Sequence, residues 1–358
     1  MSYPTVSRMK FYRDLVLSML NLVFGRVYSK PSPPSADLTG KTAIVTGANS
    51  GIGLNIALEL VRQNATVYLA CRNTSKAREA VSQIISAVPN SADRLETLLL
   101  DTSSLSSVRE CAERWKKSKS TIDILIHNAG IASTPLGQPF TVDGFPMLYA
   151  TNLLGSFLLT NLLEPCLSHR ARIIFTSSTG QYAGKFTPTF SLGTVKNRLE
   201  PGFHAPIAAV KADGIATDSA LYSNTKAMQV VFAKLLYNRW DAAAKANGTR
   251  NQRVAHAFTP GFTMTPIFGK FSMPRTIWED PTFWILKATT ILATNVSWGA
   301  ATGVWLATTE DEAVMGEGIG GGYWERMTRR VAKVDLMSTE QLERFWIRWE
   351  ADAGIVWK

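Results

Sequence analysis

The sequence of 358 residues is poor in cysteine, with only Cys71, Cys111 and Cys166, and these lie far apart. Cysteines at such spacing form neither a disulfide framework nor a metal knuckle, so we interpret them as reduced, packed residues of a cytoplasmic protein. The chain also lacks a Lys/Arg-rich run with interleaved aromatic residues, although its net charge is +10. This absence argues against nucleic acid as a partner.

A run long enough to cross a bilayer is missing as well. The segment from Phe11 to Tyr28 is mostly apolar, but only Leu15–Gly25 is free of charge, which is too short for a membrane-spanning helix. Drawn as a helix, this segment has a broad apolar face and a narrow polar stripe, which consists of Asp14, Ser18, Asn21 and Gly25.

The broad apolar face of this segment needs a cover. The first thirty residues contain five basic residues against one acidic residue, namely Arg8, Lys10, Arg13, Arg26 and Lys30 against Asp14. This balance favours a helix lying in the interface of an intracellular membrane or lipid droplet, on its cytoplasmic side. The alternative is packing on its own domain or on a second subunit of a homodimer. A Pro/Ser stretch then ends the helix and links it to the rest, so residues 1–36 form an N-terminal unit.

A glycine-rich turn dominates what the sequence does contain. The apolar run 42–45 leads into Thr46–Gly53, and beyond it apolar residues recur at helical spacing through Gln63, which predicts strand, turn and helix. Free N–H groups at a helix N-terminus attract an anion, and glycines let the chain approach it. We therefore expect a dinucleotide pyrophosphate to bind at this turn, at Gly47, Asn49, Ser50, Gly51, Ile52 and Gly53.

Apolar strands alternate with amphipathic helices along most of the chain. The further strands are predicted at 66–70, 95–100, 122–126, 172–178, 252–258 and 316–323. Such alternation indicates an α/β fold whose parallel sheet is covered on both faces and binds ligand at the carboxyl ends of its strands. We predict a single doubly wound Rossmann domain of about seven parallel strands over 37–330, preceded by the N-terminal helix and followed by a C-terminal helical extension at 331–358.

The end of the second predicted strand carries Arg72. In dinucleotide folds this strand end meets the adenosine ribose, where an acid binds the 2′-hydroxyl and an arginine accommodates a 2′-phosphate. Arg72 therefore predicts NADP(H) as the cofactor, because guanidinium pairs bidentately with phosphate. The alternative is a solvated arginine in a loop.

Two motifs together resemble the short-chain dehydrogenase/reductase family. The first is the Thr-Gly-x3-Gly-x-Gly spacing of Thr46–Gly53, and the second is Tyr222-x3-Lys226, whose side chains share one helix face. Further residues match the family at the expected positions along the chain, namely Asn128-Ala129-Gly130, Asn152 and Ser178. The resemblance covers about residues 38–268.

The resemblance implies a catalytic tetrad. In reduction of a ketone, Tyr222 would give the proton and Ser178 would hold the oxygen. Lys226 would favour the phenolate through its charge and hold the ribose of the nicotinamide. Asn152 would fix a water that links Lys226 to solvent.

The resemblance also implies further cofactor contacts. Asp101 would bind the adenine ring, although an Asp at a strand end is equally an N-cap for a helix starting near Leu105. Asn128, Ala129 and Gly130 would lie beside the cofactor at the fourth strand end. Around the nicotinamide carboxamide the resemblance places Pro260, Gly261 and Thr265.

The substrate is predicted to be lipophilic. The gap between Ser178 and Tyr222 is 222 − 178 = 44 residues and resembles the insert of the retinol-dehydrogenase-like branch. Together with the segment 266–310, which is rich in tryptophan and phenylalanine, the insert 179–221 would line a large apolar pocket. Ordinary core packing is the alternative.

The sequence thus predicts an NADP(H)-dependent oxidoreductase that transfers hydride between the cofactor and a carbonyl or alcohol. Substrates of retinoid, sterol, long-chain, polyketide or terpenoid type fit this prediction, and they place the enzyme in lipid or secondary metabolism. The rival class is a non-catalytic, membrane-associated NADP-binding scaffold or sensor. An epimerase or dehydratase shares the fold but is disfavoured by the glycine spacing.

Overall fold

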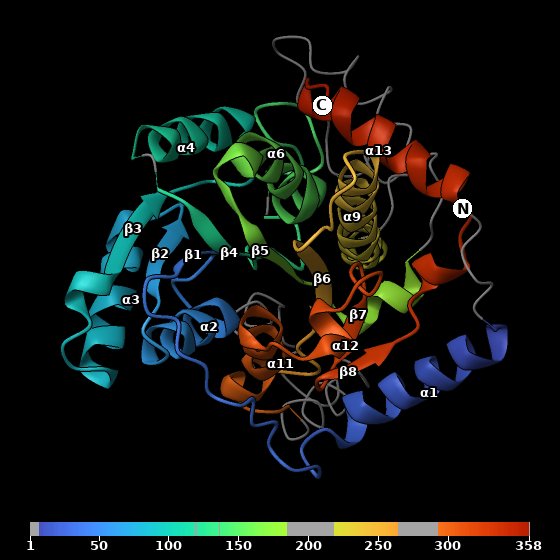
Figure 1. Cartoon of the computed structure of the whole chain (residues 1–358), viewed down its shortest axis with the longest axis horizontal. Coiled ribbons are helices and arrows are strands. Elements are labelled where there is room, and N and C mark those ends of the chain that lie inside the picture. The colour runs from blue at the N-terminus through green and yellow to red at the C-terminus, as the bar shows by residue number, and fades with distance from the viewer. Residues whose placement is uncertain (1–6, 119, 136, 185–217, 264–292, 358) are drawn as a thin grey trace.

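A single sheet organises the protein, as the computed structural model shows (Figure 1). The structure describes residues 7–118, 120–135, 137–184, 218–263 and 293–357. Its strands run in the order β3-β2-β1-β4-β5-β6-β7-β8. They are β1 (Thr42–Thr46), β2 (Thr66–Cys71), β3 (Leu95–Leu99), β4 (Ile122–His127), β5 (Leu167–Thr176), β6 (Val254–Thr259), β7 (Tyr323–Glu325) and β8 (Thr328–Arg330). All neighbouring pairs are parallel except β7–β8. The predicted parallel α/β sheet is confirmed, with one antiparallel strand added.

Helices cover both faces of the sheet (Figure 1). One face is covered by α2 (Gly51–Arg62), α3 (Thr74–Ala87) and α11 (Val296–Thr308), and the other by α4 (Leu105–Ser118), α6 (Gly155–Leu163), α9 (Asp218–Ala246) and α13 (Thr339–Ala353). The shorter elements are η1 (Ala92–Arg94), α5 (Met147–Tyr149), η2 (Ala150–Leu154), η3 (Glu164–Cys166), η4 (Thr179–Ala183), α12 (Glu312–Met315) and η5 (Lys333–Leu336). Each face has its own apolar core, as expected when strands are buried on both sides.

The strand order reverses beside β1. From β1 the chain builds outward through β2 and β3, and it then returns to pair β4 with the other side of β1. Loops at the carboxyl ends of β1 and β4 diverge at such a point and leave a crevice for ligand. The reversal brings the glycine turn after β1 next to Asn128–Gly130 after β4.

The last parallel strand is shorter than predicted. It begins only at Tyr323, because Gly318 and Gly321 have φ angles of 72° and 76° and turn the chain before it. A two-residue turn at Arg326 and Met327, both with positive φ, then leads into β8.

The N-terminal helix α1 (Arg8–Phe24) lies against the β7–β8 hairpin and ends before the predicted Tyr28. Ser18 Oγ and Asn21 Nδ2 donate to Glu325 Oε2 at 2.8 and 2.9 Å. Asp14 Oδ2 accepts from the main-chain N–H of Val331 at 2.9 Å. The polar stripe of the helix therefore faces the protein.

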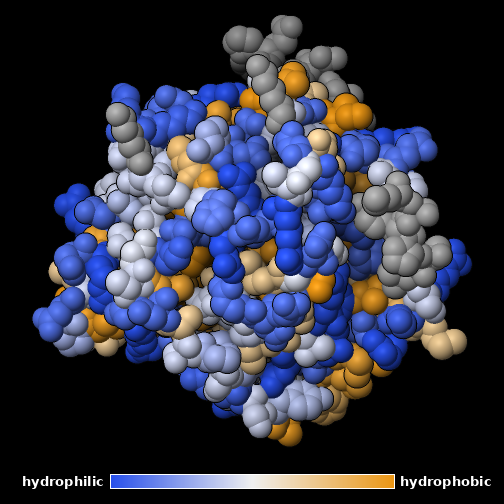
Figure 2. Space-filling model, in the orientation of Figure 1, coloured by the Kyte–Doolittle hydropathy of each residue, from blue (hydrophilic) through white to orange (hydrophobic). Residues whose placement is uncertain are grey.

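The apolar face of α1 points outward, the reverse of an ordinary surface helix. Its exposed large side chains, which continue past the end of the helix, are Met9, Tyr12, Val16, Met19, Leu20, Val23, Phe24, Val27 and Tyr28. Figure 2 shows hydrophobic side chains in this part of the surface, at the lower right. None of the helices in the described part of the chain combines the length and the hydropathy that a membrane span requires.

Candidate active site

The glycine turn after β1 is packed against the end of β4. Gly47 has a φ of 66°, and a Cβ there would lie 2.9 Å from Ala129 Cα. A Cβ at Gly53 would overlap Asn128 Nδ2 and lie 2.6 Å from the carbonyl oxygen of Gly47. Contacts within the protein therefore already require glycine at both positions. From the sequence we expected the approach of the cofactor to be the reason.

Asn128 ties these two loops together. Its Nδ2 donates to the carbonyl oxygen of Thr46 at 3.0 Å, and its N–H and that of Ala129 both donate to Thr46 Oγ1 at 2.9 Å. The Asn128 side chain, predicted to lie beside the cofactor, is thus engaged with the glycine turn. It determines where the turn sits relative to β4.

The N-terminus of α2 offers free donors to an anion. Ser50 is the N-cap, but its side chain makes no capping bond. In the described part of the chain, Leu54 N is the first main-chain donor of this helix with an acceptor, the carbonyl of Ser50 at 3.3 Å. The N–H groups of residues 51–53 stay free at the positive end of the helix dipole, so the residues present fit a pyrophosphate.

Cys71 supports the same turn from the end of β2. Its buried thiol accepts hydrogen bonds from the N–H groups of Ala48 and Asn49, and burial raises the pKa of Cys71 to about 11. The sequence indicated only packing for this residue. Nothing in its spacing distinguished it from the other two cysteines.

Arg72 and Asp101 follow the ends of β2 and β3. Arg72 is exposed and makes no hydrogen bond or ion pair with the residues that the structure describes. Asp101 Oδ1 accepts from Ser103 N and Oγ at 2.9 and 2.7 Å. The N-cap alternative for Asp101 is wrong, because Leu105 N at the start of α4 is bound by Asp143 Oδ2 at 2.9 Å. The adenine contact of Asp101 stays a prediction.

Ser178 and Tyr222 meet at the carboxyl end of β5. Ser178 caps η4 by accepting from Gly180 N at 3.1 Å, and its side chain also hydrogen-bonds Tyr222 in the first turns of α9. The neighbouring Ser177 donates instead to the carbonyl of Lys226 at 2.7 Å. Ser178 is therefore the serine whose hydroxyl lies beside the tyrosine.

The electrostatics of this pair differ from the expectation of a stabilised phenolate. Burial raises the pKa of Tyr222, and the hydrogen bond from Ser178 offsets only part of that effect. Lys226 Nζ lies 5.6 Å from the centre of the Tyr222 ring, yet burial lowers the pKa of Lys226 to about 7. Without a bound cofactor the phenol thus keeps its proton, which is the state needed to protonate a substrate oxygen.

Asn152, the fourth member of the predicted tetrad, is saturated by protein contacts. Its Oδ1 accepts from Ile131 N at 2.8 Å, and its Nδ2 donates to Ile131 O and Thr225 Oγ1 at 2.9 and 3.0 Å. Its main-chain carbonyl accepts from Gln229 Nε2 at 2.7 Å. The sequence analysis missed Gln229, whose signal was a polar residue one turn beyond Lys226 in an otherwise apolar run.

The loop after β6 lies next to this group. Thr259 Oγ1 accepts from Gly261 N at 3.1 Å and is 3.2 Å from Thr179 Oγ1, so the loop is joined to η4. Pro260 and Gly261 are thus placed at the same edge of the sheet as Ser178. Thr265 and most of the predicted pocket segments 179–221 and 266–310 lie outside the described residues.

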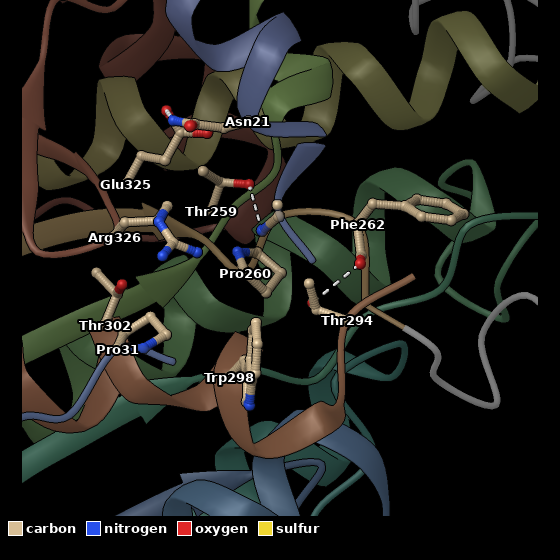
Figure 3. A pocket seen from close by; sticks show the side chains of 12 residues that line it. Asn21, Pro31, Thr259, Pro260, Phe262, Thr294, Trp298, Thr302, Glu325 and Arg326 are labelled. Carbon is tan, nitrogen blue, oxygen red and sulfur yellow. Dashed lines mark hydrogen bonds between the residues drawn. The ribbon is translucent and has the colours of Figure 1, made fainter. Parts of the chain in front are cut away.

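A pocket opens beside the loop after β6 (Figure 3). Its apolar side includes Pro260, Phe262 and Trp298. The polar lining residues are Asn21 of α1, Thr259, Thr294, Thr302, Glu325 and Arg326. The N-terminal helix is therefore part of the surroundings of the predicted nicotinamide loop, not a remote attachment.

The chain is similar to known proteins. The family model described as short chain dehydrogenase matches residues 41–191. Retinol dehydrogenase 13 from Mus musculus is 31% identical over 321 residues, which cover 88% of this chain and 84% of that protein.

Solved structures share the fold. A 3-ketoacyl-(acyl-carrier-protein) reductase from Brucella melitensis complexed with NADH superimposes with a TM-score of 0.53 at 20% identity, covering 80% of this chain and 96% of that one. A short chain dehydrogenase from Burkholderia cenocepacia in complex with NADP gives a TM-score of 0.52 at 20% identity, with coverage of 80% and 96%. At this identity the likeness concerns the fold alone.

Proposed function

We propose a specific reaction for this chain, which belongs to the short-chain dehydrogenase/reductase family and to its retinol-dehydrogenase-like branch: NADP(H)-dependent interconversion of a carbonyl and an alcohol on a lipophilic substrate. The observation that carries the proposal is the convergence of Ser178, Tyr222 and Lys226 at the carboxyl end of β5. A nicotinamide bound there supplies or accepts the hydride. The protein has to manage the proton.

The three side chains divide the proton chemistry between them. When the carbonyl carbon gains hydride, the electrons of the C=O π bond move to oxygen, which takes the proton of the Tyr222 hydroxyl. Ser178 donates a hydrogen bond to the same oxygen and stabilises its developing charge. When protonated, Lys226 places a positive charge near the phenol, and it would offer an N–H to the ribose of a bound cofactor. Asn152 holds the end of β4 in place through Ile131.

The likeness to retinol dehydrogenase 13 and the segment 266–310, rich in tryptophan and phenylalanine, support a lipophilic substrate. The pocket beside the loop after β6 borders the loop proposed to hold the nicotinamide, and its lining is partly apolar and partly polar. Retinoid, sterol, long-chain, polyketide and terpenoid carbonyls remain the proposed classes.

A substrate screen tests the reaction. Purified protein with NADPH is incubated with a long-chain aldehyde, a retinoid aldehyde and a sterol ketone, and loss of NADPH absorbance is followed. A small sugar aldehyde serves as the polar control. We expect turnover of at least one lipophilic carbonyl and little of the control. Turnover of the sugar alone would exclude the lipophilic class.

Arg72 is proposed to select NADP(H) over NAD(H). We expect Arg72→Asp to weaken NADPH binding roughly 10- to 100-fold and to spare NADH, because a charge-assisted hydrogen bond contributes about 1.5–3 kcal/mol. The measurement is KM for both cofactors. Arg78→Asp places the same charge change on the exposed surface of α3 and should leave the ratio unchanged. An unaltered ratio in Arg72→Asp would mean that this arginine only faces solvent.

The outward apolar face of α1 is proposed to lie on an anionic membrane surface. The polar stripe of α1 is hydrogen-bonded to the β7–β8 hairpin and the residue after it. The exposed face is therefore rich in Val, Leu, Met and Phe, and it lies among the basic residues of the first thirty. Both features are typical of interfacial helices. Such a location on an intracellular membrane or lipid droplet would also place the neighbouring pocket close to lipid.

Vesicle flotation tests this surface. We expect the protein to float with vesicles of phosphatidylcholine and phosphatidylserine, and Val16→Asp/Val23→Asp to abolish flotation, since two charges would have to enter the interface. Val142→Asp alters a 90% exposed valine elsewhere and is the control. Equal flotation of all variants would contradict the proposal. A dimer that dissociates only in the double variant would assign the face to a second copy of the chain.

A further inference from the structure

The carboxamide of Gln229 lies between Lys226 and the main chain of Asn152. Gln229 is fully buried on α9. Its Nε2 donates to the carbonyl oxygen of Asn152 at 2.7 Å, and its Oε1 accepts from Lys226 Nζ at 3.3 Å. The opposite amide orientation would set donor against donor and acceptor against acceptor, so these two partners fix it.

Gln229 bridges Lys226 and Asn152, the two residues between which the relay water was expected. The resemblance implied a water, held by Asn152, that links Lys226 to solvent. In the structure the carbonyl of Asn152 is occupied by Gln229, and the Asn152 side chain is engaged with Ile131 and Thr225. A carboxamide held at both ends can fix the lysine, but it has no labile acid proton to pass on.

We propose that Gln229 is a positioning residue, which replaces the relay water between Lys226 and Asn152 and holds the lysine below Tyr222 by a neutral acceptor. The inference rests on the proposed carbonyl reduction. Gln229 thus has a role that the sequence did not reveal.

The neutrality of the amide matters because Lys226 has few charged neighbours. Nζ donates to the carbonyl of Thr176 at 2.8 Å and lies near Gly130. The titratable Tyr222 lies one turn earlier on the same face of α9. Burial is the cause of its lowered pKa, and no charged side chain in the described part of the chain offsets it. An amide oxygen accepts from the lysine in either protonation state and leaves its pKa low, whereas a carboxylate would raise that pKa by pairing with the ammonium.

Gln229→Glu tests this idea through the pH profile of kcat. A carboxylate beside Lys226 would pair with the ammonium and raise the pKa of Lys226 above its value of about 7. The step of the pH profile near neutrality that follows the charge of Lys226 should therefore move to higher pH. We expect a shift of roughly one pH unit or more. A folded, active Gln229→Glu enzyme with an unshifted profile would overturn the proposal.

Two further variants separate the possible outcomes. Gln63→Glu makes the same exchange at another buried glutamine, which binds the N–H of Ala36, and should leave the profile unmoved. Gln229→Met keeps the volume but removes the bridge, and we expect kcat to fall about tenfold while KM for NADPH changes little. Unchanged kcat in Gln229→Met would also count against the proposal. If Tyr222→Phe keeps full turnover, the proposed reaction itself has failed, which the Gln229 profiles alone would not indicate.

Discussion

Tyr222→Phe is expected to lower kcat by roughly 10²- to 10⁴-fold and to leave cofactor affinity nearly unchanged. The substitution removes the hydroxyl that hydrogen-bonds the Ser178 side chain and that is proposed to protonate the substrate oxygen. The aromatic ring and its packing on α9 are retained, so the site keeps its shape. The measurement is steady-state turnover of the best carbonyl from the screen, together with NADPH titration.

A tyrosine on the same helix provides the control. Tyr237 Oη accepts a hydrogen bond from Gly318 N at 2.8 Å, away from the glycine turn and the serine, so Tyr237→Phe should reduce kcat little. Full turnover in Tyr222→Phe would exclude the proposed chemistry. Unchanged biological activity without turnover would instead favour the NADP-binding scaffold or sensor.

The first strand and the turn after it were predictable because local pattern determines them. An apolar run followed by Thr46–Gly53 can hardly be anything but a strand, a turn and a helix, and β1 and α2 lie where the pattern indicated. That Tyr222 and Lys226 share a helix face likewise followed from their spacing, whereas their catalytic roles were implied by the resemblance to the family. Each of these inferences uses residues that are close together along the chain.

The partners of each loop could not be predicted, because they come from distant segments. The reason for glycine at position 53 is Asn128, and the partner of the stripe on α1 is Glu325 near the other end of the chain. Gln229 belongs to the same class, since its role depends on the main chain of Asn152. Helical periodicity identified the polar stripe on α1, but not the residues that it contacts.

Phe157→Ala is expected to lower the free energy of unfolding by about 3–5 kcal/mol. Phe157 on α6 is fully buried, and its ring lies at 4.9–5.7 Å between centroids from four other aromatic rings. These belong to Phe232, Trp346, Trp349 and Trp357. Alanine would leave a cavity that rigid indole rings cannot collapse to fill. Urea unfolding followed by tryptophan fluorescence measures the change.

The control for this loss is Ile347→Ala. Ile347 lies on α13 beside Trp346, but its side chain is 64% exposed, so the free energy of unfolding should change by less than about 0.5 kcal/mol. A similar loss in both variants would mean that the cavity at position 157 closes without cost.

The aromatic cluster packs against the helix that carries the proposed catalytic residues. Phe232, a member of the cluster, is on α9, and so are Tyr222 and Lys226. Because the substituted ring touches neither of those residues in the contacts described, folded Phe157→Ala should retain its kcat and lose activity only where it unfolds. The middle of α9 would then contribute to the free energy of unfolding through packing, and its first turns would contribute to kcat through Tyr222 and Lys226.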